Sequence, residues 1–417
     1  MRSLGGGGGP LGAAAGATGG RRRRGPPPPA AAAKPPPATM LWRAAAERTA
    51  LASAASEARR PRPTRPAPAA AGRQADGDGA EDAGEAEGGE SEAEFEGPLP
   101  ELSEARHIIV QPGFSDAASD LRAVFDERFG DPRKPLREHF LWHYWYVENQ
   151  YTLHRTQAAA YFPKALYKRL ESDLIAYGER VLGCRAITPV WMSYYVDGCA
   201  QELHCDSFHG PFAFVLSLTH WEERAFTGGE TMILKPATLD FWSGFQPGRG
   251  LELGDLVELV PPRFNQLTLF DPRLPHGVRP VHGTRDPMKS RLVLHGWFTE
   301  PSPFIEGGLE PEAAVEALNE ALDAIFEEFE ALPAVLGTLT VRIDVRGADG
   351  GVDGVAFLAD TLVVRPGQVI TDDEGEPLPD SAARAAVQHA VRDGLAAARF
   401  PACAGGDTRV TYPFVFE

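Results

Sequence analysis

The chain has 417 residues, of which 43% are hydrophobic, and a formal net charge of −17 at pH 7. This length exceeds one typical domain, and the composition is compatible with substantial buried cores. The negative charge argues against a nucleic-acid partner, because phosphate binding needs a basic face, and no stretch reaches the apolar length of a membrane span. No CxxC pair occurs among the four cysteines, which fits a soluble protein of a reducing compartment.

The first hundred residues are low in complexity. Residues 1 to about 75 are rich in Gly, Pro, Ala and Arg, whereas residues 76–104 carry many acidic residues and no basic one. Neither block has hydrophobic periodicity, so residues 1–100 are predicted to be disordered. The start is similar to an organellar transit peptide, Arg21 to Arg24 are compatible with a nuclear signal, and a plain solvated tail is the third interpretation. The compartment is therefore expected to be cytoplasmic or organellar; a true start at Met40 would shorten this segment without removing it.

Ordered structure is expected from about His107. The stretch "HIIVQPGF" predicts a short strand, and Ser115 with Asp116 predicts the cap of a helix that reaches Phe125. The run "FLWHYWYVENQY" (140–151) is dense in aromatic residues and is typical of barrel cladding or, less often, of a substrate groove. Apolar residues at helical spacing behind Pro163 then predict an amphipathic helix: Leu166, Leu170, Leu174, Tyr177 and Val181.

Residues 204–276 carry three potential metal ligands. Alternate side chains of a strand share a face, so His204 and Asp206 of "HCD" are expected to project together, unless they are only an exposed polar pair. His276 follows about 70 residues later, which leaves room for several antiparallel strands. Two histidines and one carboxylate form the facial triad that holds non-haem Fe(II). We prefer His276 to His282 because of its Pro-His-x-Val-x-Pro-Val frame.

Arg291 opens an apolar strand that ends at Phe298. Alternation along this strand places Arg291, Val293, His295 and Trp297 on one face. A planar guanidinium can bind a carboxylate through two parallel hydrogen bonds, so Arg291 is expected to grip a co-substrate, with a surface arginine as the alternative. His295 is expected beside Arg291, either as a pocket residue or as a satisfied buried histidine.

Four stretches together resemble the successive signatures of 2-oxoglutarate/iron(II) oxygenases, most of all the prolyl-hydroxylase-like branch: "YYVDGCAQELHCD", "FTGGETMIL", "NQLTLFDPRLPHGVRPV" and "SRLVLHGWF". The resemblance covers about residues 191–298. It implies a double-stranded β-helix, with His204, Asp206 and His276 as Fe(II) ligands and Arg291 on the outer carboxylate of 2-oxoglutarate. It also implies that Tyr195, or its neighbour Tyr194, lines the co-substrate pocket.

Two departures from this family accompany the resemblance. Ser217 stands where relatives often carry a tyrosine that helps to hold 2-oxoglutarate. The stretch "HGTRDPMK" (282–289) lengthens the chain between His276 and Arg291 and is interpreted as an inserted hairpin tip.

The resemblance implies a 2-oxoglutarate-dependent dioxygenase that hydroxylates its substrate and releases succinate and carbon dioxide. Its cofactor is Fe(II), dioxygen is the second co-substrate, and ascorbate is a candidate reductant. The substrate is expected to be a protein or peptide side chain, with proline as the first guess, and a small molecule stays open. Two alternatives remain: a catalytically silent sensor that binds iron or 2-oxoglutarate, and an interaction protein that acts through its C-terminal region.

Well-patterned sequence continues beyond the oxygenase signatures. Apolar residues three and four apart predict a helix from Pro311 to Leu332, and alternation predicts strands over 339–345 and 355–364. A helix from Ser381 and a last strand in "RVTYPFVF" complete a ββαβ pattern. This pattern resembles the C-terminal domain of TonB-type proteins over about 337–417, which implies a protein partner for it.

The predicted fold class is mainly β with flanking helices. Residues 101–305 are expected to form the oxygenase domain, a double-stranded β-helix (jelly-roll) core with helices on its N-terminal side. Residues 306–417 are expected to add a helix and a small α+β domain.

Overall fold

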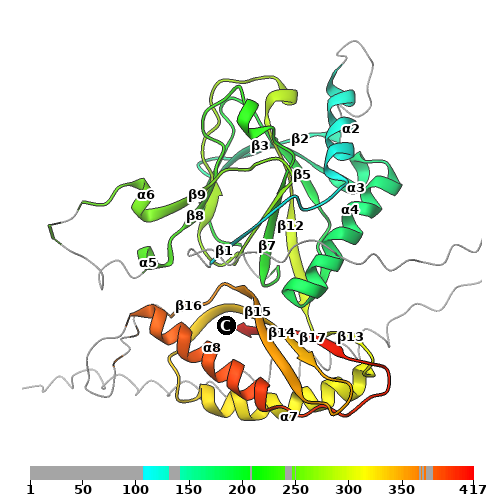
Figure 1. Ribbon diagram of the computed structural model, residues 1–417. Coiled ribbons are helices and arrows are strands. Elements are labelled where there is room, and N and C mark those ends of the chain that lie inside the picture. Colours follow the sequence, from blue (N-terminus) through cyan, green and yellow to red (C-terminus); the bar gives the residue numbers. More distant parts are fainter. Residues whose placement is uncertain are drawn as a thin grey trace, which may run out of the picture.

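The computed structural model describes residues 107–130, 141–206, 209–239, 247–248, 250–365, 368, 371 and 379–417. The expectations for residues 1–100, among them the targeting signals and the start at Met40, lie outside the described residues. The described chain forms two units, each with its own sheet (Figure 1). None of the helices in these ranges is long and apolar enough to cross a membrane.

The first unit contains a 12-stranded antiparallel sheet that folds into two layers. Its strands are β1 Ile108–Pro112, β2 His143–Val147, β3 Tyr151–Gln157, β4 Cys184–Ile187, β5 Trp191–Tyr195, β6 Ala200–His204, β7 Phe212–Ser217, β8 Thr231–Leu234, β9 Val257–Val260, β10 Gln266–Phe270, β11 His276–Val278 and β12 Arg291–Pro301. One layer runs β1-β10-β7-β12-β5 and the other runs β6-β11-β8-β9. Strand β3 pairs with both β5 and β6 and so joins the layers, which confirms the predicted double-stranded β-helix architecture.

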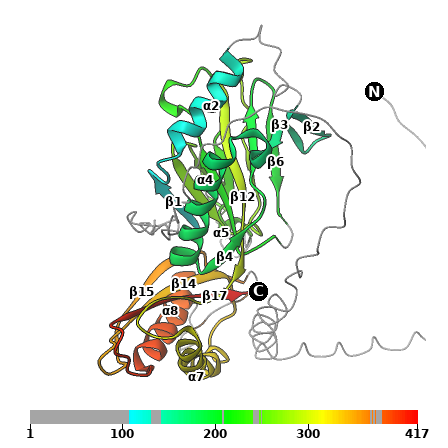
Figure 2. The ribbon, with the colours of Figure 1, turned by 90° about the vertical axis from the view of Figure 1, so that its right-hand side faces the viewer.

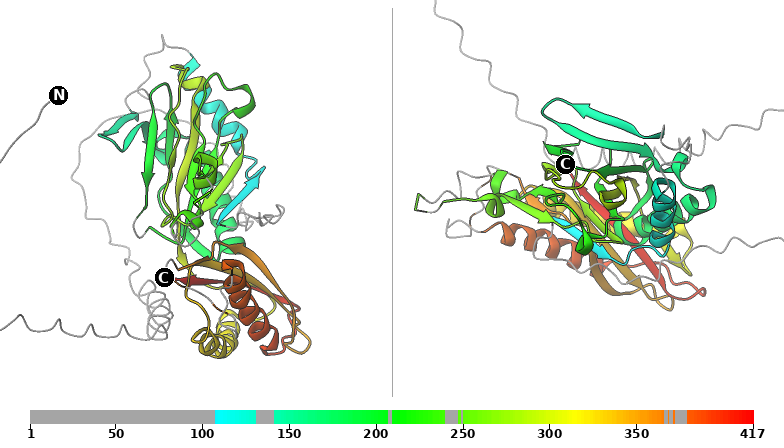
Figure 3. Two further views of the ribbon diagram at one scale, coloured as in Figure 1. Left: turned by 90° about the vertical axis from the view of Figure 1, so that its left-hand side faces the viewer. Right: turned by 90° about the horizontal axis from the view of Figure 1, so that it is seen from above.

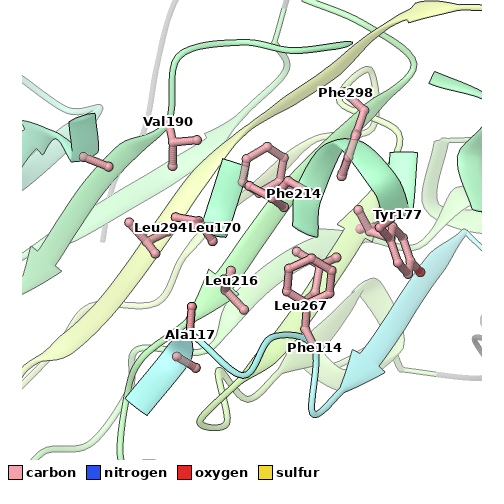
Figure 4. Close-up of a cluster of buried hydrophobic side chains, with 14 of the residues drawn as sticks. Phe114, Ala117, Leu170, Tyr177, Val190, Phe214, Leu216, Leu267, Leu294 and Phe298 are labelled. Carbon is pink, nitrogen blue, oxygen red and sulfur yellow. The ribbon is translucent and has the colours of Figure 1, made fainter. Parts of the chain in front are cut away.

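Helices cover one face of the larger layer. They are α2 Ala118–Gly130, α3 Ala158–Tyr161 and α4 Lys164–Tyr177, the last continuing into a π-helical turn over Gly178–Leu182. Figure 2 shows α2 and α4 along this face. The predicted amphipathic helix is confirmed, since Leu170, Leu174 and Tyr177 are fully buried in the cluster beneath it. Figure 4 shows Leu170 and Tyr177 in this cluster.

The side chains of β12 point alternately to two sides of the larger layer. One side is the helix-covered core, and the other faces the space between the layers. Leu292, Leu294 and Phe298 point into the helix-covered cluster, together with Phe214 and Leu216 of β7. Because strand side chains alternate, the residues between them point to the opposite face, into the space between the layers. The helices therefore stabilise the larger layer and leave its inner face free for a site.

The aromatic run is described from residue 141 onward, and its residues 143–151 belong to a hairpin instead of covering the barrel. Trp142 packs against the helix-covered cluster, but Tyr144 and Tyr146 of β2 are 61% and 60% exposed. Strand β2 pairs only with β3 among the described strands, and it lies at the outer edge of the unit in Figure 2. The expectation that these rings cover the barrel is therefore wrong for β2.

The second unit confirms the predicted ββαβ pattern. Its elements are β13 Phe304–Gly307, α7 Pro311–Phe329, β14 Val335–Val345, β15 Val352–Asp360, β16 Val363–Val364, α8 Asp380–Ala397 and β17 Thr408–Phe416. The strand expected over 355–364 is divided, because the Asp360 carboxylate accepts from the Leu362 N–H in a turn that returns the chain to β14. Figures 1 and 3 show the sheet between the first unit and the helices α7 and α8.

The two units share a packed contact at the π-helical turn. Gly183, at φ 65°, ends the turn, and a Cβ there would lie 2.6 Å from Pro413 of β17. The Thr340 hydroxyl donates to the Leu182 carbonyl at 3.0 Å, and Leu358 joins the buried cluster of the first unit. The division at residue 305 stays a prediction, and these contacts mean that removing residues 306–417 would expose apolar surface of the first unit.

Candidate active site

Strand pairing brings three metal-ligand side chains to one point. In the antiparallel pair of β6 and β11, His204 lies directly opposite His276, with ring centroids 4.5 Å apart. Asp206 follows β6, and its carboxylate oxygens lie 3.6 Å from His204 Nε2 and 3.4 Å from His276 Nε2. The possible ligand atoms all lie within 4.8 Å of one another. This two-histidine, one-carboxylate set fits a facial site for Fe(II).

Both histidine rings are oriented by backbone carbonyls. The Nδ1–H of His204 donates to the Glu202 carbonyl, and that of His276 donates to the Leu274 carbonyl, each at 2.9 Å. A carbonyl only accepts, so Nδ1 carries a proton in both rings and each Nε2 is turned toward the Asp206 carboxylate. Metal-bound histidines are commonly held in this way.

The charges in the cluster suit a divalent cation. Burial lowers the pKa of His204, and the neighbouring His276 lowers it further. Burial alone would raise the pKa of Asp206, but hydrogen bonds and charges from His276, His204 and Trp297 together place it below its ordinary value. The histidine is thus held neutral and the carboxylate ionised, which are the protonation states that metal binding requires.

Trp297 of β12 positions the carboxylate ligand. Its indole Nε1–H donates to Asp206 Oδ2 at 3.0 Å. Such supporting contacts commonly contribute about tenfold to a hundredfold to metal affinity. We therefore expect Trp297→Phe to weaken Fe(II) binding by about that factor, measured by competition with a chelator of known affinity. Trp221→Phe, at a buried tryptophan that bonds none of the three ligands, is the control, and an unchanged affinity in Trp297→Phe would contradict this role.

Arg291 lies fully buried on the same inner face. Its Nε donates to the Gly229 carbonyl at 2.7 Å and its Nη2 to the Thr231 hydroxyl at 3.1 Å. The third nitrogen, Nη1, is buried and has no hydrogen-bond partner among the described residues. Leaving a charged donor unpaired in the interior is costly, so the geometry fits an anion that binds at Nη1.

Strand β8 links this arginine to the metal ligands. Thr231, which holds Arg291, lies on β8, and Ile233 of the same strand is opposite His276. Two strand residues span about 7 Å, which is on the scale of a five-carbon dicarboxylate. The residues present therefore fit 2-oxoglutarate with one end at the metal and its outer carboxylate at Arg291.

The structure separates the two candidate tyrosines. Tyr195 is opposite Arg291 in the pair of β5 and β12, and the Arg291 Cζ lies 4.7 Å from the centre of its ring. Tyr194 faces the other way, into the helix-covered cluster, and stacks on His154 with ring centroids 4.6 Å apart. The expectation that Tyr194 lines the pocket is wrong, because neighbouring strand residues point to opposite faces.

His295 lies on the inner face as expected. Its Nε2 shares a hydrogen bond of 2.8 Å with the Ser193 hydroxyl. Burial, helped by the charges of Arg291 and Arg155, lowers the pKa of His295 to about 4. This histidine is therefore neutral at physiological pH and provides a polar wall beside Arg291.

Two other expected features take different partners. The Ser217 hydroxyl donates its single proton to the Pro262 carbonyl at 2.7 Å, so it has no donor left for a co-substrate carboxylate. His282 bridges to Thr227 away from the triad, and residues 287–289 form a 3-10 turn. The stretch 282–289 is thus not the hairpin tip that its sequence suggested.

Sequence reasoning missed three contributors to the site. Gly229 and Thr231 accept hydrogen bonds from Arg291. Both lie in the "FTGGETMIL" stretch, whose sequence indicated the family resemblance but not this contact. Only indirect evidence for the hydrogen bond from Trp297 to Asp206 was present in the sequence, because strand alternation predicted that Trp297 lies on the inner face.

Comparison with known proteins agrees with this site. A family model described as the 2OG-Fe(II) oxygenase superfamily matches residues 190–299. No curated protein sequence matches the chain. The comparisons give no support to the resemblance of the second unit to TonB-type domains, so that interpretation is withdrawn.

Several solved structures resemble part of the chain. A prolyl-4-hydroxylase from Pseudomonas putida is 19% identical, with a TM-score of 0.33, over 46% of this chain and 92% of that one. A 2OG-Fe(II) oxygenase family oxidoreductase from Burkholderia pseudomallei is 15% identical, with a TM-score of 0.31, over 48% of this chain and 87% of that one. The α-ketoglutarate-dependent epimerase SnoN from nogalamycin biosynthesis is 15% identical, with a TM-score of 0.32, over 46% of this chain and 76% of that one.

The family match spans all three candidate ligands. Residues 190–299, which contain the whole cluster of His204, Asp206 and His276, are thus similar to the 2OG-Fe(II) oxygenase superfamily, for which Fe(II) is the typical cofactor and 2-oxoglutarate the typical co-substrate.

Proposed function

We propose that this enzyme hydroxylates a protein or peptide side chain, with proline as the first candidate, and couples this to the conversion of 2-oxoglutarate into succinate and carbon dioxide. The observation that carries the proposal is the buried Arg291, whose Nη1 has no partner among the described residues, on the same inner face as the triad. A dicarboxylate that binds one end at the metal and the other at Arg291 would make use of both the arginine and the three ligands.

Each pocket residue has a distinct role in this proposal. His204, Asp206 and His276 hold Fe(II), which supplies the activation of dioxygen when 2-oxoglutarate is bound. Arg291 binds the outer carboxylate, and Tyr195 packs beneath the guanidinium. Neutral His295 adds no charge that would compete with Arg291 for the carboxylate.

A peptide substrate is favoured by the surface beside the pocket. The hairpin of β2 and β3 presents exposed aromatic rings, and β3 pairs directly with β6, which carries His204. Aromatic side chains are enriched where proteins bind other chains. In this view the catalytic residues lie in residues 101–305, and residues 306–417 form a packing or interaction unit for protein partners.

The test is turnover by the full-length protein. With Fe(II), 2-oxoglutarate and dioxygen, proline-containing peptides should gain one oxygen, and succinate should form in a one-to-one ratio with the oxygenated peptide. Peptides are scored by mass spectrometry and succinate by chromatography. Binding of 2-oxoglutarate without any succinate would instead support the silent sensor.

A further inference from the structure

A second arginine on the inner face, Arg155 of β3, lies between two tryptophans. Its Cζ is 3.6 Å from the centre of the Trp145 ring and 4.6 Å from that of Trp191. These rings come from β2 and β5, the strands that pair with β3 on its two sides. Stacking of this kind covers the planar faces of a guanidinium and leaves its N–H groups at the edge.

No described residue accepts a hydrogen bond from the Arg155 side chain, and no described carboxylate pairs with it. Arg224, which also stacks on a tryptophan, differs in this respect. Arg224 stacks on Trp221 at 3.9 Å, but its Nη1 also donates to the Trp221 carbonyl at 2.8 Å. Arg155 is half-buried, and burial lowers its pKa, which reflects the cost of keeping this cation partly away from water.

Arg155 lies on the same face of the sheet as Arg291, the proposed co-substrate clamp. It is opposite Ser193 of β5, whose hydroxyl bonds His295, and Ser193 is in turn opposite Val293 of β12. The charges of both Arg291 and Arg155 act on His295. The inner face therefore carries two cations, while 2-oxoglutarate needs only Arg291 for its outer carboxylate.

An anionic group on the substrate would match the second cation. We propose that Arg155, held between Trp145 and Trp191, binds a carboxylate of the substrate, so that the enzyme selects acidic substrates. This inference rests on the proposed function and adds the chemical class of the substrate to it. The carboxylate comes either from an acidic side chain of a peptide or from a free organic acid.

The net charge of the chain does not oppose this selection at short range. The formal charge of −17 repels acids at a distance, but exposed charges are largely screened beyond about 10 Å at 0.1 M ionic strength. Within the pocket the nearby guanidinium dominates. A charge-assisted hydrogen bond in a partly dry site discriminates strongly between a carboxylate and an amide of the same shape.

The test uses the full-length enzyme with Fe(II) and saturating 2-oxoglutarate. One arm offers proline-containing peptides in matched pairs, with Glu or Gln and with Asp or Asn at each flanking position. The other arm offers small organic acids and their primary amides. In both arms kcat/KM is measured from succinate formation, and products are identified by a mass gain of one oxygen. The arm that yields product identifies the source of the carboxylate.

The wild-type enzyme should prefer acids over their amides by about tenfold or more. Arg155→Gln should bring this ratio close to one, and Arg155→Lys should keep part of it, since a point charge replaces the planar fork. The control Arg224→Gln should keep the wild-type ratio. The ratio compares kcat/KM for the acid and for the amide in the same preparation of a variant. Misfolded protein lowers both values by the same factor and so leaves the ratio unchanged.

Several outcomes would overturn the assignment to Arg155. They are equal rates for acids and amides in the wild type, an unchanged ratio in Arg155→Gln, or a raised KM for 2-oxoglutarate with the ratio intact. Succinate formation without any oxygenated compound in either arm would also overturn it, while leaving the enzyme a 2-oxoglutarate oxygenase. If no succinate forms under any condition, the proposed function itself is wrong.

Discussion

Replacing His204, Asp206 or His276 with alanine should reduce 2-oxoglutarate turnover to background. Each variant removes one of three ligands whose atoms lie within 4.8 Å of one another, and two ligands cannot hold the metal in a fixed facial geometry. Turnover is measured as succinate formed by purified protein with Fe(II), with and without candidate substrate. Iron content after dialysis should fall in parallel.

His282→Ala is the matched control for the ligand assignment. His282 lies six positions after His276 in the sequence, but its backbone pairs with that of Thr227, away from the cluster. This variant should keep turnover close to that of the wild type. An inactive His282 variant beside an active His276 variant would show that the ligand was chosen wrongly.

Arg291→Ala should raise the KM for 2-oxoglutarate by about ten- to a hundredfold, which is the usual effect of losing a charge-assisted hydrogen bond. Fe(II) affinity should change little, because the hydrogen bonds of Arg291 go to Gly229 and Thr231 and not to the ligands. Arg291→Lys should recover only part of the affinity, since an ammonium cannot reproduce the planar fork. The KM is measured from succinate formation at fixed Fe(II).

Two other arginines serve as controls for the clamp. Arg279 pairs with Glu230 at 3.4 Å and Arg285 with Asp197 at 3.6 Å, so their charges are already balanced. Arg279→Ala and Arg285→Ala should leave the KM for 2-oxoglutarate unchanged. If the KM rises in either of them and not in Arg291→Ala, the outer carboxylate binds elsewhere.

The triad could be predicted from sequence because its geometry is partly local. His204 and Asp206 are two positions apart, and the frame around His276 separates it from His282. Strand alternation also predicted the inner face of β12, where Trp297 and His295 now have identified partners. The periodic helices and the ββαβ order of the second unit followed from hydrophobic spacing alone.

The remaining features depend on tertiary contacts that spacing does not encode. The choice between Tyr194 and Tyr195 needed the register of β5 against β12. The partner of Ser217 is a carbonyl 45 positions away, and the exposure of β2 depends on which strand it pairs with. Arg155 carried no motif at all, because its significance lies in Trp145 and Trp191, which approach it from separate strands.

The most direct test is a crystal structure of the full-length protein, grown without oxygen with Fe(II) and 2-oxoglutarate, and measured at the iron absorption edge. One anomalous peak should lie among His204 Nε2, His276 Nε2 and the Asp206 carboxylate, with the outer carboxylate of 2-oxoglutarate on Arg291 Nη1. An iron peak at other residues, or 2-oxoglutarate bound away from Arg291, would contradict the account.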